Sequence, residues 1–381
     1  MPNKTTEELD QLIVNVISSS ASLGKGIHPL IVEEIARFLV KVNSYYTNAM
    51  EGNPSKLRDI ENALNKKFAT DKKARNYQLE HVAHIEIQEA MIQRLREDPD
   101  LSICSENFLC WIHEQFFIRL PEEMRFATTE SGKLVPVEPV NLRNQGITVG
   151  HHEAPETKNK IKQFLTIFEN LLSPEKLVGN QKLIGMASSH HRLLWIHPFA
   201  EGNGRVARLF TTAYGLRIGV GDNNLWTVTR AFARNRNEYD SHLALADQPR
   251  RNDLDGRGPL SEENLVKFCT FFLKCCEDQI TFMGSMLKYP DLNRRYLHYV
   301  EGLVKEKQIS KSAEKVMDRL ILQGEIQRSE IIDICKVKKR RSTEIIKELL
   351  DSKIVYSQKA YGPLKLNITV DMATVLFPHL A

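Results

Sequence analysis

The segment from residue 197 to residue 208 constrains the fold more than any other part of this chain. Pro198 removes a backbone donor and disfavours helix at the residue before it, so the preceding apolar run should end at His197. Gly202 and Gly204 allow the main chain to turn tightly. A second helix is predicted over residues 205–216, because its apolar residues are spaced to bury one face. The segment therefore predicts a helix, a glycine-rich turn and another helix.

The polar residues of this segment can bind phosphate and activate a hydroxyl. Free amides and the positive end of the dipole make the start of the second helix an anion site. Arg205 and Arg208 can point to one side of its first turn. His197 can accept a proton near neutral pH, and Glu201 would repel phosphate unless a cation, usually magnesium, lay between them. Each element alone is typical of an ordinary loop, but together they favour a functional site.

The segment resembles the signature of the Fic family, His-x-Phe-x-(Asp/Glu)-Gly-Asn-Gly-Arg-x-x-Arg, at every fixed position. The resemblance implies a mostly α-helical Fic core with a β-hairpin flap. It also implies an adenylyltransferase that moves AMP from ATP to a Ser, Thr or Tyr hydroxyl of a target protein, with His197 as the base. In this family Mg²⁺ bridges the α- and β-phosphates. The resemblance assigns the metal to Glu201, the anion hole to Gly202, Asn203 and Gly204, and the β- and γ-phosphates to Arg205 and Arg208.

A short strand or hairpin is predicted at residues 147–153, where Ile147 and Val149 alternate between glycines. His151 and His152 are too few ligands for a zinc site. Beside the signature, the segment resembles the Fic flap, which covers the nucleotide and pairs with an extended stretch of the target. The resemblance therefore adds Val149, Gly150, His151 and His152 to the ATP-binding residues.

Residues 236–243 are predicted to form a helix that carries Tyr239. A lone helical tyrosine is more often a core or surface residue than a ligand-binding one. The Fic family places a tyrosine here against the adenosine, so the resemblance assigns Tyr239 to the ATP pocket. Asp247 stands where many members have asparagine, and we expect it to accept a hydrogen bond from the ribose or the adenine amine.

An N-terminal helix is predicted to end near Gly52, since apolar residues recur at helical spacing before it. Glu51 in its last turn would by default be a solvated side chain. Residues 47–52, starting at Thr47, match the inhibitory motif of the Fic family, Ser/Thr-x-x-x-Glu-(Gly/Asn). The resemblance implies a class II arrangement, in which Glu51 pairs with Arg208 and occupies the guanidinium that the γ-phosphate needs.

The composition of the 381 residues is that of an ordinary globular protein, because 42% of them are hydrophobic and 26% are charged. The net charge of +4 is too small to indicate nucleic acid or membrane by itself. No apolar stretch approaches the length of a membrane span, and the polar start is unlike a signal peptide. The six cysteines lack paired metal spacing and fit reduced thiols, so we expect a cytoplasmic location without membrane contact.

Three domains are expected: an N-terminal helical region with the inhibitory motif (1–100), the Fic core (101–288) and a winged-helix-like domain (289–381). In the last domain, apolar spacing predicts two helices followed by a two-stranded wing. A basic cluster opens the second helix, where DNA phosphates are often bound. This cluster consists of Lys338, Lys339, Arg340 and Arg341. Because winged helices also serve as docking or dimer modules, DNA and protein stay open as partners.

Three functions follow from these patterns. The preferred one is a magnesium-dependent protein adenylyltransferase that Glu51 inhibits, with ATP and a target protein as partners and a homodimer left open. The second is a Fic enzyme that removes AMP from its target or uses another nucleotide. Family kinases lose the first glycine and the arginine of Gly-Asn-Gly-Arg, and this chain keeps both. The third is a DNA-binding regulator that acts through the basic cluster and binds duplex in a salt-sensitive way.

Overall fold

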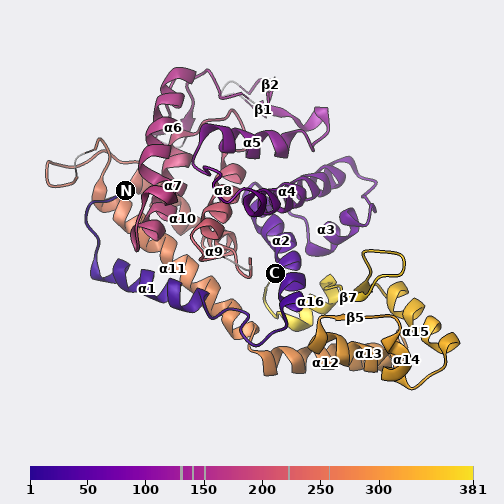
Figure 1. Cartoon of the computed structure of the whole chain (residues 1–381). Coiled ribbons are helices and arrows are strands. Elements are labelled where there is room, and N and C mark those ends of the chain that lie inside the picture. Colours follow the sequence, from indigo (N-terminus) through magenta and orange to yellow (C-terminus); the bar gives the residue numbers. More distant parts are fainter. Residues whose placement is uncertain (129–131, 140, 150–151, 222–223, 257, 381) are drawn as a thin grey trace. The chain divides into compact units, whose positions relative to one another are not determined.

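The computed structural model describes residues 1–128, 132–139, 141–149, 152–221, 224–256 and 258–380. Within these residues the chain is mostly α-helical and adds small antiparallel sheets, which confirms the predicted fold class (Figure 1). No helix in the described ranges has both the length and the apolar character that a membrane crossing requires.

The chain divides into two compact units, each built from segments that are distant in the sequence. Unit 1 comprises Met1–Ala21 and Asn43–Ile280, and unit 2 comprises Ser22–Val42 and Thr281–Ala381. Two long helices, α2 (Pro29–Met50) and α11 (Glu262–Met286), contribute residues to both units.

The other helices of unit 1 begin in most cases at a polar residue whose side chain accepts a backbone N–H, as Thr6, Asp71, Ser105 and Thr157 do. These helices are α1 (Glu7–Ser20), α3 (Leu57–Leu64), α4 (Lys72–Glu97), α5 (Glu106–Phe117), α6 (Lys158–Leu172), α7 (Gln181–Ile196), α8 (Asn203–Arg217), α9 (Val228–Arg234) and α10 (Arg236–Ala246), with the short 3-10 turns η1 (Glu122–Met124) and η2 (Pro174–Lys176).

Helix α8 carries the second half of the signature, from Asn203 to Arg208, and packs against α4, α5 and α7. The predicted apolar face is confirmed, because Val206, Leu209, Phe210 and Ala213 are all buried. Burial extends to the polar side of the helix, where Arg205 and Arg208 are also buried. The two guanidinium groups are therefore largely withdrawn from bulk water.

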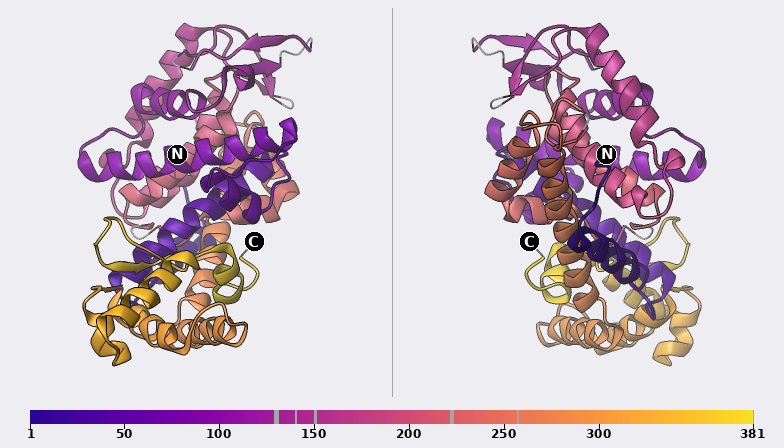
Figure 2. Two further views of the ribbon diagram at one scale, coloured as in Figure 1. Left: turned by 90° about the vertical axis from the view of Figure 1, so that its right-hand side faces the viewer. Right: turned by 90° about the vertical axis from the view of Figure 1, so that its left-hand side faces the viewer.

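Two hairpins complete unit 1, and both lie at the end of the unit where α5 and α6 are found (Figure 2). Strand β1 (Phe126–Thr128) pairs with β2 (Leu134–Pro136) in antiparallel register, with Ala127 opposite Val135. Strand β3 (Thr148–Val149) pairs with β4 (His152–Glu153), with Val149 opposite His152. The second pair confirms the hairpin that the alternating residues predicted.

Unit 2 contains a helix–turn–helix followed by strands, as predicted. Its helices and strands are α12 (Tyr289–Lys305), α13 (Lys311–Gln323), β5 (Glu325–Ile326), α14 (Glu330–Cys335), α15 (Lys339–Asp351), β6 (Val355–Tyr356), β7 (Leu364–Leu366) and α16 (Val370–Leu376). The two strands predicted for the wing pair with each other as β6 and β7, and β5, which was not predicted, adds a third strand in the order β5-β7-β6. A two-residue strand such as β5 is too short to show a period of two.

The basic cluster lies at the start of α15. Lys338 caps the helix, and the next three residues form its first turn. The side chain of Arg340 is 94% exposed and lies 3.4 Å from Glu344, which also pairs with Arg341 at 3.0 Å. Two of the four cations therefore share one carboxylate on their own helix.

Candidate functional site

The loop between α7 and α8 is held in place by Arg143. His197 follows the last residue of α7 in the left-handed conformation, with φ 48° and ψ 62°. The guanidinium of Arg143 donates to the carbonyl oxygens of Ile196 (3.2 Å) and His197 (2.6 Å), and its backbone N–H donates to Pro198 (3.0 Å). It also donates to the carbonyl of Pro155 at 2.7 Å, just beyond the flap. One side chain therefore fixes both the signature loop and the end of the flap.

The imidazole of His197 is arranged as a neutral base. Its Nδ1 lies 3.3 Å from the carbonyl oxygen of Leu194. Since a carbonyl can only accept, Nδ1 carries the proton and Nε2 keeps its lone pair. Burial lowers the pKa of His197 to about 4, although the Leu194 carbonyl acts in the opposite direction. The ring is therefore uncharged at neutral pH and can accept a proton from an alcohol.

The Gly-Asn-Gly turn presents backbone amides at the start of α8. Gly202 has φ 82°, and a Cβ atom there would lie 2.9 Å from the ring of Phe117, so conformation and space both require glycine. The Asn203 side chain accepts from the N–H of Phe199 (3.0 Å) and donates to its carbonyl (2.8 Å). Asn203 thus closes the loop, and backbone amides at the start of a helix such as α8 suit an anion.

Arg208 is engaged by the end of α2. Its guanidinium donates to the Thr47 hydroxyl at 2.6 Å and to the Thr47 carbonyl at 3.3 Å, and it forms an ion pair with Glu51. Burial alone would raise the pKa of Glu51, but the charges of Arg208, Arg205 and Arg236 together lower it below its ordinary value. Glu51 is therefore ionised at neutral pH and is bound to the last arginine of the signature.

Gly204 provides the space for this ion pair. A Cβ atom at this position would lie 2.6 Å from Oε1 of Glu51 and 3.0 Å from the guanidinium of Arg208. The glycine of the anion site thus also lets the Glu51 carboxylate approach the helix start.

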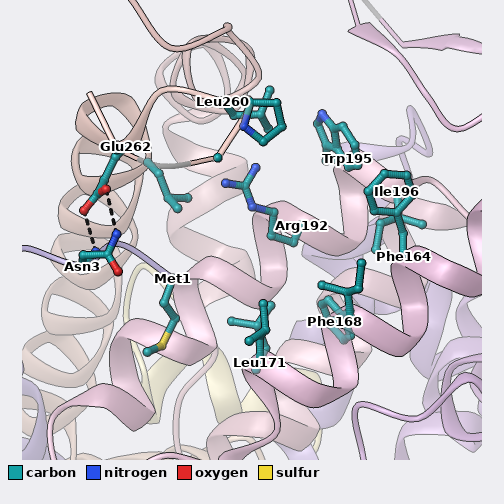
Figure 3. Close-up of a pocket in the computed structure, with 16 residues that line it drawn as sticks. Met1, Asn3, Phe164, Phe168, Leu171, Arg192, Trp195, Ile196, Leu260 and Glu262 are labelled. Carbon is teal, nitrogen blue, oxygen red and sulfur yellow. Dashed lines mark hydrogen bonds between the residues drawn. The ribbon is translucent and has the colours of Figure 1, made fainter. Parts of the chain in front are cut away.

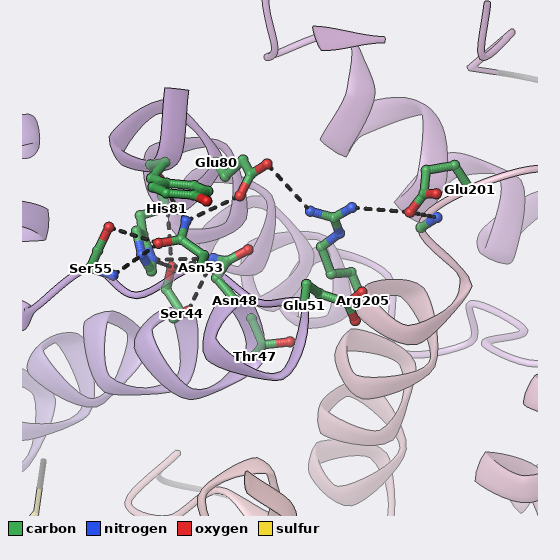
Figure 4. A network of polar contacts seen from close by, with 12 residues as sticks. Ser44, Thr47, Asn48, Glu51, Asn53, Ser55, Glu80, His81, Glu201 and Arg205 are labelled. Carbon is green, nitrogen blue, oxygen red and sulfur yellow. Dashed lines mark hydrogen bonds and ion pairs between the residues drawn. The ribbon is translucent and has the colours of Figure 1, made fainter. Parts of the chain in front are cut away.

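Arg205 lies between two carboxylates (Figure 4). One of its terminal nitrogens is 3.4 Å from Glu201 and the other is 4.0 Å from Glu80, while its guanidinium lies 4.7 Å from the ring centre of Phe116. Glu80 also accepts from the side-chain amide of Asn53 at 3.1 Å. Burial raises the pKa of Glu80, against the effect of Arg205. Aromatic and acidic partners on both sides fix the direction of this guanidinium.

Glu201 is the residue suited to hold a cation here. Its Oε1 accepts the N–H of Gly202 at 2.9 Å, and its side chain is 40% exposed. Among the described residues, no group of three or more His, Cys, Asp or Glu side chains is arranged around a metal position. A single half-exposed carboxylate fits magnesium, which commonly takes its other ligands from phosphate oxygens and water.

The flap rests on α7 through His152. The His152 ring stacks on Trp195 with 4.8 Å between ring centres, and its Nε2 lies 2.8 Å from the Trp195 carbonyl. Val149, opposite His152 in the hairpin, is 38% exposed. Gly150 and His151, also predicted to bind ATP, lie outside the described residues. The flap is therefore attached to α7 at Trp195, two residues before His197.

Tyr239 and Asp247 both contact histidines of α7. Tyr239 is buried, its ring stacks on Phe232 at 4.6 Å, and its hydroxyl lies 2.9 Å from Nε2 of His190. Oδ1 of Asp247 is 2.9 Å from Nε2 of His191. Here both residues are packed against protein groups, and their assignment to the ATP pocket stays a prediction.

Sequence reasoning did not identify Arg143, Glu80 or Trp195. Arg143 has backbone carbonyls as partners, and these come from residues distant in sequence, so no local pattern marks it. Glu80 belongs to the otherwise ordinary helix α4. Trp195 adjoins the signature, and its position two residues before His197 is the one signal that could have indicated it.

The site thus combines a buried helix start, a neutral histidine beside it and a hairpin attached to the last turn of α7. Residues 103–214 match the family described as Fic/DOC, and the chain therefore contains a Fic domain. This match confirms the resemblance that the signature predicted. It covers the flap, the signature loop and most of α8, whereas Glu51 lies outside it.

Curated relatives agree with this family. The protein named Protein adenylyltransferase Fic of Culex quinquefasciatus is 26% identical over 204 residues, which are 54% of this chain and 36% of the relative. The protein of that name in Nematostella vectensis is 29% identical over 177 residues, which are 46% of this chain and 37% of the relative. The alignments thus span little more than a third of these relatives.

Solved structures show the same fold. A Fic family protein from Desulfovibrio desulfuricans G20 has a TM-score of 0.57 at 16% identity, covering 96% of this chain and 97% of that one. Fic-1 from C. elegans has a TM-score of 0.54 at 16% identity, covering 74% of this chain and 73% of that one. The likeness to both structures extends beyond the residues of the family match.

Proposed function

We propose that this protein transfers AMP from ATP to a Ser, Thr or Tyr hydroxyl of a target protein. The observation that carries the proposal is the neutral His197 beside the amides of the α8 N-terminus, inside a matched Fic domain. The curated relatives carry the name of this activity. ATP and a protein target are the partners that it requires.

In the proposed reaction, the target hydroxyl oxygen bonds to the α-phosphorus of ATP, and its proton passes to Nε2 of His197. The bond between the α-phosphorus and the bridging oxygen breaks, and pyrophosphate leaves. The amides of α8 and the guanidinium of Arg205 stabilise the charge on the phosphates. Glu201 would hold a magnesium ion, which neutralises phosphate charge when bound. Most of the catalysis is positioning and electrostatics, as phosphorus chemistry requires.

We propose that Glu51 inhibits this reaction. Its pairing with Arg208 occupies a guanidinium that would otherwise bind the γ-phosphate, and its carboxylate lies against the anion site at Gly204. An ATP γ-phosphate would meet negative charge where it needs positive charge. Removal of this carboxylate is therefore expected to activate the enzyme.

The test is incubation of the Glu51→Gly variant with ATP labelled at the α-phosphate and with magnesium. Automodification is expected to rise at least tenfold over the unaltered protein, since one charged competitor is removed from the phosphate site. Glu97→Gly, which removes an exposed glutamate at the end of α4, serves as the matched control and should change nothing.

A double variant and a second label make this experiment decisive. In the double variant with His197→Ala, transfer should be lost while ATP binding persists. Label that still appears without the imidazole would contradict its role as the base. Transfer only from γ-labelled ATP would indicate a kinase, and equal rates with and without Glu51 would remove the inhibitory assignment.

Unit 2 supports a winged-helix assignment through its helix–turn–helix and three-stranded sheet. We propose that this module docks protein, because Glu344 partly neutralises the basic cluster. Duplex DNA binding that weakens steeply with salt would favour the DNA alternative instead. The free cysteines support a reducing compartment such as the cytoplasm.

A further inference from the structure

A cavity of unit 1 lies between α6, α7 and the start of α11 (Figure 3). Its volume is about 300 Å³, which is at the lower end of the range for small-molecule sites. Most of its lining is apolar, and the larger side chains are Phe164, Phe168, Leu171, Trp195 and Leu260. Nothing in the proposed transfer reaction uses this cavity.

One charged side chain in the lining of this cavity, Arg192, has no ion-pair partner among the described residues. The guanidinium of Arg192 stands among the apolar side chains, and within the described part of the chain it has no hydrogen-bond acceptor or carboxylate partner. Glu262, the carboxylate in the lining, accepts instead from the backbone N–H of Asn3 (2.5 Å), from the Asn3 amide (3.1 Å) and from the N–H of Lys4 (3.1 Å). An unpaired cation in an apolar cavity is costly, and an anionic ligand would offset that cost.

The opening of the cavity is also apolar. Ile167 is 51% exposed and Leu171 is 60% exposed, and the two lie one helical turn apart on α6. Exposed apolar side chains at the mouth of an apolar cavity favour a ligand with a hydrocarbon tail. The site thus offers the Arg192 guanidinium inside and an apolar path along α6.

We propose that this cavity binds a small amphipathic monocarboxylate, with its carboxylate on Arg192 and its hydrocarbon tail against α6. A planar guanidinium matches a carboxylate in two-point geometry. Burial lowers the pKa of Arg192, and Asp247 acts in the opposite direction, so the guanidinium keeps its charge.

Trp195 makes this site observable and links it to the flap. The indole lines the cavity on one side and stacks with His152 of the flap on the other. Its buried N–H has no acceptor among the described residues, so ring packing holds it. A ligand in the cavity would therefore change the surroundings of Trp195, and its binding can be followed by tryptophan fluorescence.

The test is a titration of the full chain with octanoate and with octanamide, which has the same shape and no charge. Binding is followed by calorimetry and by fluorescence, with Trp195→Phe to assign the signal. Octanoate is expected to bind at least tenfold more tightly than octanamide. Arg192→Gln should abolish this preference, whereas Arg294→Gln, which removes an exposed arginine of unit 2, should keep it.

A second variant keeps the proposal testable if Arg192→Gln does not fold. Leu171→Glu replaces an exposed residue at the opening and should weaken octanoate binding at least tenfold through repulsion, with little effect on octanamide. Equal affinity for the two ligands, no binding of octanoate up to its solubility, or full octanoate affinity in folded Arg192→Gln would each overturn the proposal.

Discussion

At the scale of single residues, the buried side chain of Arg143 is bound by four backbone carbonyl oxygens and by no carboxylate among the described residues. It donates to the carbonyls of Gln145 (2.5 Å), Pro155, Ile196 and His197. Burial lowers its pKa to about 10, so it stays charged at neutral pH. Because carbonyl dipoles and not carboxylates surround it, Arg143 can order the signature loop without an acidic neighbour that would repel ATP.

Replacement of Arg143 by methionine should therefore damage both stability and transfer. Several buried carbonyls would lose their donors, so the free energy of unfolding should fall by at least about 2 kcal/mol. The measurement is urea denaturation, together with the transfer rate in the Glu51→Gly background. Arg125→Met is the control, because Arg125 also donates to two carbonyls but lies in a more exposed position. Unchanged stability and rate in Arg143→Met would show that the loop is ordered by other contacts.

At the scale of elements, the end of α2 is bound to other helices at three points. Thr47 and Glu51 contact Arg208 of α8, and the carbonyl of Met50 accepts from Arg236 of α10 at 2.5 Å. The carbonyls in the last turn of a helix have no partner inside that helix, so Arg236 supplies one. If Glu51 inhibits transfer, the strength of the inhibition depends on the position of this whole helical turn as well as on the charge of Glu51.

Thr47→Val tests this dependence, since it keeps the shape of the side chain and removes the hydroxyl that accepts from Arg208. Arg208 would lose one of its hydrogen bonds to α2, which is worth about 1–3 kcal/mol for a charged donor. Automodification should rise above that of the unaltered protein but stay below that of Glu51→Gly. Thr47→Ser retains the hydroxyl and should behave as the unaltered protein does. A Thr47→Val rate no higher than that of Thr47→Ser would contradict this view.

The elements also show what local sequence could predict. The helix at α8 and the β3–β4 pairing were predicted because apolar spacing and glycines are local signals. Strand β5 was not predicted, because it depends on pairing with the distant strand β7. The role of Arg143 was not predicted either, because its partners are the carbonyls of residues 155 and 196–197. The contact of Glu51 with Arg208 spans 157 positions and was anticipated through family resemblance alone.

At the scale of the whole chain, the compact units do not follow the sequence order. Residues 22–42 group with the C-terminal hundred residues, while the rest of the N-terminal helices group with the Fic match. Boundaries are usually read from breaks in composition, but here α2 and α11 run through them as uninterrupted helices. A continuous helical period carries no signal of where one core ends and another begins.

Unit 1 should lose stability on mild acidification because it buries neutral histidines. Burial lowers the pKa of His81, His113 and His197 to about 4 and that of His190 to about 3. Between the unfolded value of about 6.5 and these native values, the unfolded chain binds more protons, so stability falls as pH decreases. At pH 5 the loss is about 2 kcal/mol for each such histidine.

Other groups leave this trend intact. Carboxyl groups with a raised pKa, such as Glu80, act in the opposite direction, whereas Glu51, with a lowered pKa, adds to the loss only below about pH 4.5. All three tryptophans belong to unit 1, so their fluorescence follows its unfolding in urea. The urea midpoint should be clearly lower at pH 5 than at pH 7, and His81→Gln should reduce that difference. A midpoint that does not change between these pH values would mean that the buried histidines take up protons without unfolding.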